Sequence, residues 1–145
     1  MTGIVLPGDT NARGTIFGGR VLEMIDKAGA IAALRHCRTE VVTASMDHVD
    51  FRSPVRLGDI IRLEAIVHQV FRSSLEVGVK VFSEDPMSGE RHHTTTAYVT
   101  MVAVGADGRP VRAPELEVAT PQARARAREA ERRRRWRLAA RARGH

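Results

Sequence analysis

Cysteine and long apolar runs are scarce in this chain of 145 residues. Cys37 is the one cysteine, so no disulfide can form within the chain, which fits a reducing compartment. No apolar run approaches the roughly 18 residues that a membrane-spanning helix needs. The N-terminal segment also lacks the basic-then-apolar pattern of a secretory leader. We therefore expect a cytoplasmic protein with no membrane span.

Lysine is equally scarce, and the basic charge comes almost wholly from arginine. Residues 124–143 hold ten arginines and two glutamates, so this segment is strongly basic while the rest of the chain is slightly acidic. We expect a folded domain over residues 1–118 and an arginine-rich C-terminal tail over residues 119–145. Blocks of like charge are usually solvated, so the tail should be partly helical or disordered. Contact with a phosphate-bearing partner such as nucleic acid or anionic lipid is the alternative.

Residues 19–36 predict one long helix that follows Gly18. At about 100° per residue, its apolar side chains cover most of the circumference. Only Arg20, Glu23 and Lys27 form a narrow polar stripe. A helix that is apolar nearly all round is one enclosed by other structure.

Most of the chain after this helix predicts strands, and a short strand should precede it. Four segments of β-branched or alternating apolar residues are separated by turn residues, namely 41–51, 60–71, 75–81 and 91–104. Short turns between consecutive strands imply antiparallel neighbours. We therefore predict the α+β class, with a curved antiparallel sheet of about five strands wrapped round one long apolar helix, which is the hotdog architecture. The unpaired sheet edge favours a homodimer that continues the sheet.

Asp26 is a carboxylate in the otherwise apolar part of the predicted helix. Desolvating an ionised carboxylate is costly, so a chain that keeps one there often uses it. Its helical neighbours Gly29, Ala30 and Ala33 are small and would leave room for a substrate. Asp26 could act as a general base on water or as a nucleophile. The alternative is a carboxylate that pairs with an arginine at an interface.

Gly18 and Gly19 stand at the start of the predicted helix. The first amides of a helix have no internal partner, and the helix dipole is positive there. Glycines would expose these amides, which could polarise a carbonyl as an oxyanion hole. Two adjacent glycines alone are more typical of a tight turn.

Other polar residues permit more than one interpretation. Asn11, in the loop before the helix, can hold a water or a carbonyl but cannot act as a base, and alone it is typical of a turn. Arg72, Ser73 and Ser74 separate two predicted strands and could bind phosphates, with a plain β-turn as the alternative. No group of histidines and cysteines has the spacing of a zinc site, so we expect no metal.

His48 and Asp50 share one face of a predicted strand. A His–Asp pair suggests a catalytic dyad, but no nucleophilic serine or cysteine is placed for it by the sequence. We interpret the pair as a solvated or interface feature.

Two stretches of the chain carry a family resemblance. The first is Asn11-x-x-Gly14-x-x-Phe17-Gly18-Gly19-x-x-Leu22-x-x-x-Asp26, and the second is Val42-Thr43-Ala44-Ser45-x-Asp47-x-Val49-Asp50-Phe51-x-x-Pro54-Val55-x-x-Gly58-Asp59. With these motifs the chain resembles hotdog-fold acyl-CoA thioesterases of the brain acyl-CoA hydrolase type and their bacterial single-domain relatives, from about Leu6 to Pro114. Phe71 departs from the pattern, because the family often has glycine before the turn at Arg72.

The resemblance implies hydrolysis of acyl-CoA thioesters to free acid and CoA, with no metal or other cofactor. The family's catalytic aspartate falls on Asp26. Its catalytic asparagine falls on Asn11, which would act across a dimer interface on the Asp26 of the partner subunit. The family's sites lie at such interfaces, and its dimers often assemble into hexamers. A homodimer is thus the expected minimal unit and a trimer of dimers the expected assembly.

The same resemblance gives the remaining polar groups a role. Phe17 and the Arg72-Ser73-Ser74 turn would bind the substrate, and the helix-start amides would form the oxyanion hole. The basic tail could also contact CoA phosphates.

Two other functions stay open. A hotdog module that senses acyl-CoA without cleaving it, and whose basic tail binds nucleic acid, would need neither Asp26 nor Asn11. A hotdog dehydratase would need a histidine before or within the first helix, and His36 falls too late in the chain.

Overall fold

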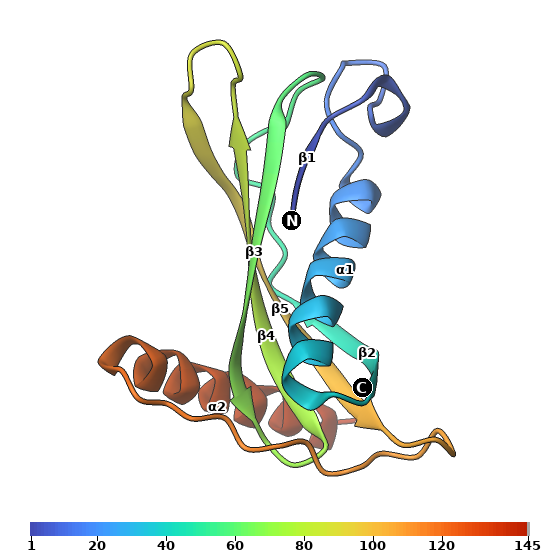
Figure 1. Cartoon of the computed structure of the whole chain (residues 1–145), viewed down its shortest axis with the longest axis vertical. Coiled ribbons are helices and arrows are strands. Elements are labelled where there is room, and N and C mark those ends of the chain that lie inside the picture. The colour runs from blue at the N-terminus through green and yellow to red at the C-terminus, as the bar shows by residue number, and fades with distance from the viewer. Residues whose placement is uncertain (145) are drawn as a thin grey trace.

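The computed structural model describes residues 1–144, which form a five-stranded antiparallel sheet with a helix on each side (Figure 1). The strand order across the sheet is β1-β3-β4-β5-β2. The elements are β1 (Thr2–Ile4), the 3-10 helix η1 (Pro7–Asp9), α1 (Gly18–Cys37), β2 (Glu40–Asp47), β3 (Ile60–Val70), β4 (Ser74–Glu84), β5 (Arg91–Val104) and α2 (Pro121–Ala142). The predicted hotdog architecture is confirmed.

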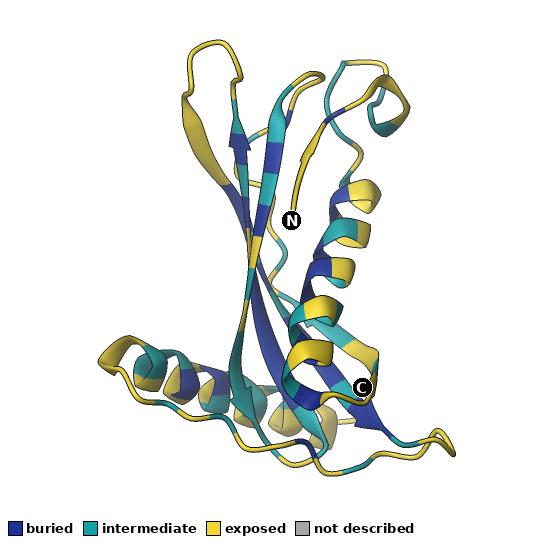
Figure 2. Ribbon diagram, viewed as in Figure 1, coloured by how far each residue is buried: buried dark blue, intermediate teal, exposed yellow. Residues whose placement is uncertain are grey.

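Helix α1 lies along the inner face of the sheet and buries one side against it (Figure 2). Val21, Ile25 and Ala33 have no exposed surface, and they meet inward-facing residues such as Val79 and Val99. Burying a side chain of this size contributes roughly 1.5–3 kcal/mol. The helix and the sheet therefore form one hydrophobic core.

Gly29 lies at the closest approach of α1 to the sheet. A Cβ at this position would lie 3.4 Å from Cε of Met101 and 3.7 Å from side-chain atoms of Val79 and Val99. The expectation that Gly29 leaves room for a substrate is therefore wrong, and the same holds for fully buried Ala33. These two small residues serve packing.

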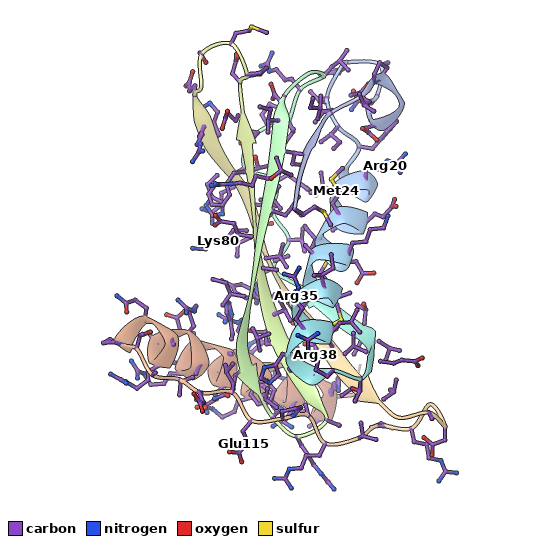
Figure 3. All side chains as sticks on the ribbon, viewed as in Figure 1. Arg20, Met24, Arg35, Arg38, Lys80 and Glu115 are labelled. Atoms are coloured by element: carbon purple, nitrogen blue, oxygen red, sulfur yellow. The ribbon has the colours of Figure 1, made fainter. Side chains whose placement is uncertain are left out.

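Strand β4 is covered on both faces near its start. Leu75, Val77 and Val79 point into the core, so the alternation of a strand turns Glu76 and Gly78 to the outer face, where they are also buried. Helix α2 crosses this outer face at one end of the sheet (Figure 1). Farther along β4, Lys80 is exposed and projects from the side of the sheet away from α1 (Figure 3).

Helix α2 is anchored to the sheet by polar contacts rather than by large apolar side chains. Its buried residues are Ala127 and Ala130. The Arg133 guanidinium binds Glu76, and that of Arg134 stacks over the Phe71 ring at 4.8 Å. The sequence did not predict this docking of the arginine-rich segment.

Two non-glycine residues in the left-handed region end elements of the fold. Arg38, at φ 55°, closes α1 and donates its amide to Leu34 O at 2.8 Å. His48, at φ 57°, directly follows β2, so this strand ends at Asp47 rather than at Phe51 as predicted. Beyond His48 the ladder with β5 is interrupted, but the chain stays beside β5, where the Arg52 amide donates to Thr94 O at 2.9 Å. Within residues 1–144, no helix is long and apolar enough to cross a membrane.

Candidate active site

Asp26 lies halfway along α1 and contacts strand β2. The Thr43 hydroxyl donates a hydrogen bond of 2.5 Å to Oδ1 of Asp26 and also lies 3.5 Å from Sδ of Met101. Asp26 is half-buried, and Thr43 is exposed in the single chain. The contact joins a carboxylate to a hydroxyl across 17 residues of sequence.

A β-bulge follows Thr43. Thr43 pairs with Met101 and Ser45 with Thr100, so Ala44 is the extra residue between them. Val41 and Thr43 share one strand face, and Val41 packs against the core beneath α1. A bulge changes the direction of the strand locally and often re-aims side chains near functional sites. Here it follows directly on the residue that contacts Asp26.

The N-terminus of α1 is open. Its N-cap is Phe17, whose side chain makes no capping hydrogen bond, and the first turn holds no acidic residue. Within residues 1–144, no acceptor is found for the amides of Gly18 and Gly19. Such amides, together with the positive end of the helix dipole, favour a developing negative charge.

A small hollow lies beside this helix start. It has a volume of about 240 Å³ and is lined by Gly18, Phe51 and Thr15 among others. The Phe51 ring lies 3.5 Å from where a Cβ of Gly18 would stand, so the ring forms one wall of the hollow beside the helix start. Phe17 is 53% exposed beside it, which leaves its ring free to contact a ligand.

Asn11 organises its own loop in the single chain. Its Nδ2 donates to Oγ1 of Thr15 at 3.0 Å, and its Oδ1 accepts from the Arg13 amide at 2.9 Å. The backbone amide of Gly14 also donates to Asn11 O at 3.0 Å. This is the turn role that the sequence offered as the alternative for Asn11.

The helix start and Asp26 are far apart within one chain. Asp26 follows Gly18 by eight residues, which corresponds to about 12 Å along a helix. A single carbonyl group cannot contact both from the same helix. The structure of one chain therefore brings Asp26 to Thr43 but does not bring it to the helix-start amides.

The turn at Arg72 lies under the segment that follows β5. The Arg72 and Ser73 carbonyls accept from the amides of Ala113 and Ala103 at 2.7 and 2.8 Å. Arg72 and Arg112 both line a hollow of about 280 Å³ beside this turn. Arg112 was missed by sequence reasoning, because only the fold brings it to Arg72.

Within residues 1–144, His48 and Asp50 form no hydrogen-bonded pair with each other. The His48 ring lies 6.1 Å from that of Tyr98 and 6.3 Å from that of Trp136, while Asp50 is exposed. Over residues 1–144, no group of three or more histidines, cysteines, aspartates or glutamates is placed to hold a metal ion.

Comparison with known proteins places these features in a family. The model of the thioesterase superfamily matches residues 13–90, which contain the open helix start, Asp26, Thr43 and the Arg72 turn. The chain belongs to the thioesterase superfamily. Within it, the uncharacterized acyl-CoA thioester hydrolase YkhA of Bacillus subtilis is 47% identical over 115 residues, which cover 79% of this chain and 67% of YkhA.

Solved thioesterase structures superpose over nearly the whole chain. An apo-hexameric acyl-CoA thioesterase has a TM-score of 0.93 at 43% identity and covers 98% of this chain and 91% of its own. The acyl-CoA hydrolase of Staphylococcus aureus, in complex with butyryl-CoA, CoA and CoA disulfide, has a TM-score of 0.90 at 34% identity and covers 98% and 87%.

The S. aureus hydrolase has also been solved as three single-alanine variants, of an asparagine, an aspartate and a threonine. In that order the three positions lie 15 and 17 residues apart. Asn11, Asp26 and Thr43 have the same two spacings in this thioesterase-superfamily chain. Sequence reasoning quoted Thr43 in a motif but gave it no role. The hydrogen bond from Thr43 to Asp26, which points to a role for Thr43, is visible only in the structure.

Proposed function

We propose that the protein is an acyl-CoA thioesterase that hydrolyses acyl-CoA to the free acid and CoA. The observation that carries this proposal is the hydrogen bond from Thr43 of β2 to Asp26, halfway along α1. A hydroxyl donor holds the carboxylate in one orientation. No donor to Asp26 Oδ2 is found within residues 1–144, so this oxygen is free to accept a proton from water.

Asp26 acts as a general base or as a nucleophile. As a base, it takes a proton from water while the water oxygen attacks the thioester carbonyl carbon. The carbon–sulfur bond then breaks, CoA leaves as its thiolate and takes up a proton, and the acid is released. As a nucleophile, a carboxylate oxygen of Asp26 attacks the carbonyl carbon, the carbon–sulfur bond breaks and CoA leaves as its thiolate, and water then hydrolyses the transient anhydride to the free acid and the Asp26 carboxylate. Both routes need a carboxylate at position 26.

The oxyanion hole and the asparagine come from a second subunit. Because Gly18 and Gly19 stand about 12 Å from Asp26 along their own helix, a carbonyl near Asp26 must meet the helix start of a partner. Asn11 belongs to the loop that precedes this helix start and arrives with it. A homodimer is thus the minimal active unit. The hexameric relative supports further assembly into a trimer of dimers.

The CoA portion binds by charge and by hydroxyl groups. Arg72 and Arg112 offer two guanidinium groups over one hollow, and Ser73 and Ser74 add hydroxyls beside them. Phe17 is exposed at the helix start, where it can contact the pantetheine or acyl portion. A single buried cysteine suits a reducing compartment, and we place the enzyme in the cytoplasm.

The test is turnover of several acyl-CoAs by wild type, Asp26→Asn and Asp26→Ala, followed through release of the CoA thiol. We expect kcat to fall by roughly 10²–10⁴-fold, with a melting temperature close to that of wild type. Asp50→Asn, at an exposed site, is the matched control and should retain activity. Full activity of Asp26→Ala would refute the proposed mechanism. Acyl-CoA binding without turnover in wild type, together with binding of DNA, would support the sensor instead.

A further inference from the structure

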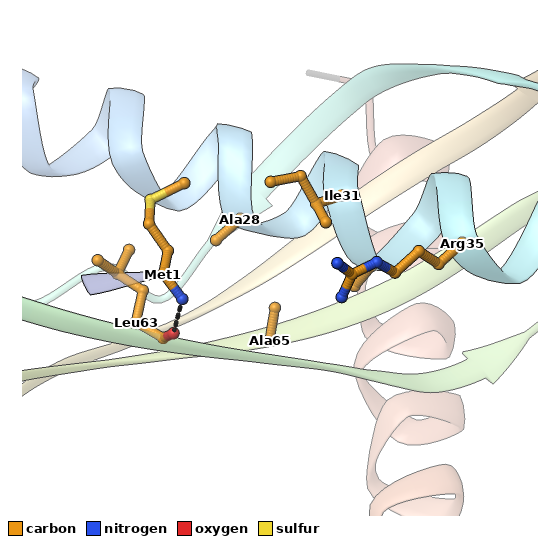
Figure 4. A pocket seen from close by; sticks show the side chains of 7 residues that line it. Met1, Ala28, Ile31, Arg35, Leu63 and Ala65 are labelled. Carbon is orange, nitrogen blue, oxygen red and sulfur yellow. Dashed lines mark hydrogen bonds between the residues drawn. The ribbon is translucent and has the colours of Figure 1, made fainter. Parts of the chain in front are cut away.

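A second pocket lies between α1 and β3, about half a turn round the helix from Asp26 (Figure 4). Its volume is about 190 Å³. Helix α1 contributes Ala28, Ile31, Ala32 and Arg35. None of the residues given a role in catalysis lines it.

The pocket lies beside the part of β3 that follows its pairing with β1. Strand β1 pairs with β3 only from Ile60 to Arg62, although β3 continues to Val70. Beyond this pairing, the space between α1 and β3 is walled by Leu63 and by the small side chain of Ala65.

The pocket holds the N-terminal ammonium of Met1, which donates to Leu63 O at 3.1 Å, and one cationic side chain, that of Arg35. The Arg35 guanidinium points toward the hollow from the last turns of α1 (Figure 4). No carboxylate forms an ion pair with it within residues 1–144. The other side chains of the wall are apolar, including Ile31, which is 41% exposed. The pocket thus combines an apolar surface with the guanidinium of Arg35 at one end and the Met1 ammonium beside Leu63.

This combination suits an amphiphilic anion. A carboxylate accepts hydrogen bonds from a guanidinium in a bidentate geometry, and an alkyl chain gains free energy by covering the apolar wall. Pockets for drug-sized ligands usually measure about 300–1,000 Å³. The pocket beside Arg35 is smaller than that, so its ligand carries a short chain.

We propose that this pocket binds a short-chain carboxylic acid, with the carboxylate on Arg35 and the chain over Ala28, Ala32 and Ala65. Its biological role rests on the proposed function, because a free carboxylic acid is the product of acyl-CoA hydrolysis. The pocket would hold this product on the side of α1 away from Asp26, so product and substrate can be bound at the same time.

Binding of hexanoate to the full-length protein tests this inference. We would measure affinity by calorimetry and locate the site by NMR shifts of the Ala28, Ile31 and Ala65 methyl groups. Arg35→Gln should weaken binding about tenfold or more, because a hydrogen bond between charged groups is lost. Arg38→Gln removes the same charge from the exposed end of the same helix and should leave affinity unchanged. Ala65→Ile should fill the hollow and abolish binding.

Hexanol and inorganic phosphate separate the two parts of the ligand. Both should bind much more weakly than hexanoate, since each offers only the chain or only the charge. Equal affinity for either would overturn the inference, as would unchanged hexanoate affinity in Arg35→Gln. If Asp26→Ala loses hexanoate binding while Arg35→Gln keeps it, hexanoate binds in the catalytic site. This result would also overturn the inference. Acyl-CoA hydrolysis is measured in a separate assay. Failure of the proposed function would therefore appear as absent turnover, independently of the measured hexanoate affinity.

Discussion

The Arg133 guanidinium donates two hydrogen bonds to the Glu76 carboxylate, at 2.9 Å from Nε and 2.8 Å from Nη2. Glu76 has no exposed surface, and it also contacts Nδ1 of His68 at 2.9 Å. The Arg133 guanidinium stacks 3.7 Å above the Tyr98 ring. Burying the Glu76 charge without a partner would be strongly destabilising, so the pairing with Arg133 determines where α2 packs on the sheet.

A second ion pair extends the contact to the end of β2. Arg137 donates to Oδ2 of Asp47 at 3.1 Å, and Trp136 lies beside His48. Asp47 is the last residue of β2, the strand that carries Thr43, and His48 follows it. Helix α2 therefore contacts β2 through Asp47, and the same strand contacts Asp26 through Thr43.

Glu76→Gln should destabilise the protein by about 3 kcal/mol, because it leaves the Arg133 cation without its buried partner. Urea unfolding of the two proteins measures this difference. Glu84→Gln breaks the exposed pair with Arg91 and should cost less than about 1 kcal/mol. Equal losses in the two variants would mean that the Glu76 contact does not anchor the helix.

Stability should fall in acid through Glu76. Burial alone would raise the pKa of this carboxyl, but hydrogen bonds from Arg133 and His68 and their positive charges outweigh it and hold the pKa below its ordinary value of 4.5. A group whose pKa is lowered by folding stabilises the protein above its unfolded pKa, and that stability is lost as pH falls through the folded pKa. The free energy of unfolding should thus decline below about pH 4.5. The decline should be shallower in Glu76→Gln, and identical pH profiles would contradict this assignment.

Mixing two inactive variants should restore activity if the site spans two subunits. Asn11→Ala and Asp26→Ala should each be inactive, but after mixing and refolding, each heterodimer regains one complete site. The recovered activity is measured against each variant refolded alone. No recovery from heterodimers that are shown to form would place both residues in one subunit's site, or in none.

Removal of residues 119–145 should leave a folded but less stable protein. The core beneath α1 contains no side chain of α2, and the lost contacts include those around Glu76 and Asp47 and the stacking of Arg134 on Phe71. In the shortened chain Glu76 faces water, so Glu76→Gln should then change stability by less than about 1 kcal/mol. A loss as large as in the full chain would show that Glu76 is buried without α2. Urea unfolding of all four proteins completes this cycle.

The sequence alone determined the elements and the candidate carboxylate. Apolar periodicity located α1 within one residue at each end and found the four long strands, because side-chain spacing reports which face is buried. Asp26 was conspicuous for the same reason, since it interrupts an apolar pattern.

Only the tertiary structure decided which distant residues meet. Thr43 reaches Asp26 through the packing of β2 beside α1, and Glu76 is buried because α2 covers the outer face of β4. Local propensity cannot reveal such contacts. A glutamate that alternates with valines predicts a solvent-facing position unless another element covers it. The pocket at Arg35 is likewise visible only in the fold, since it brings Arg35 of α1 beside Leu63 and Ala65 of β3.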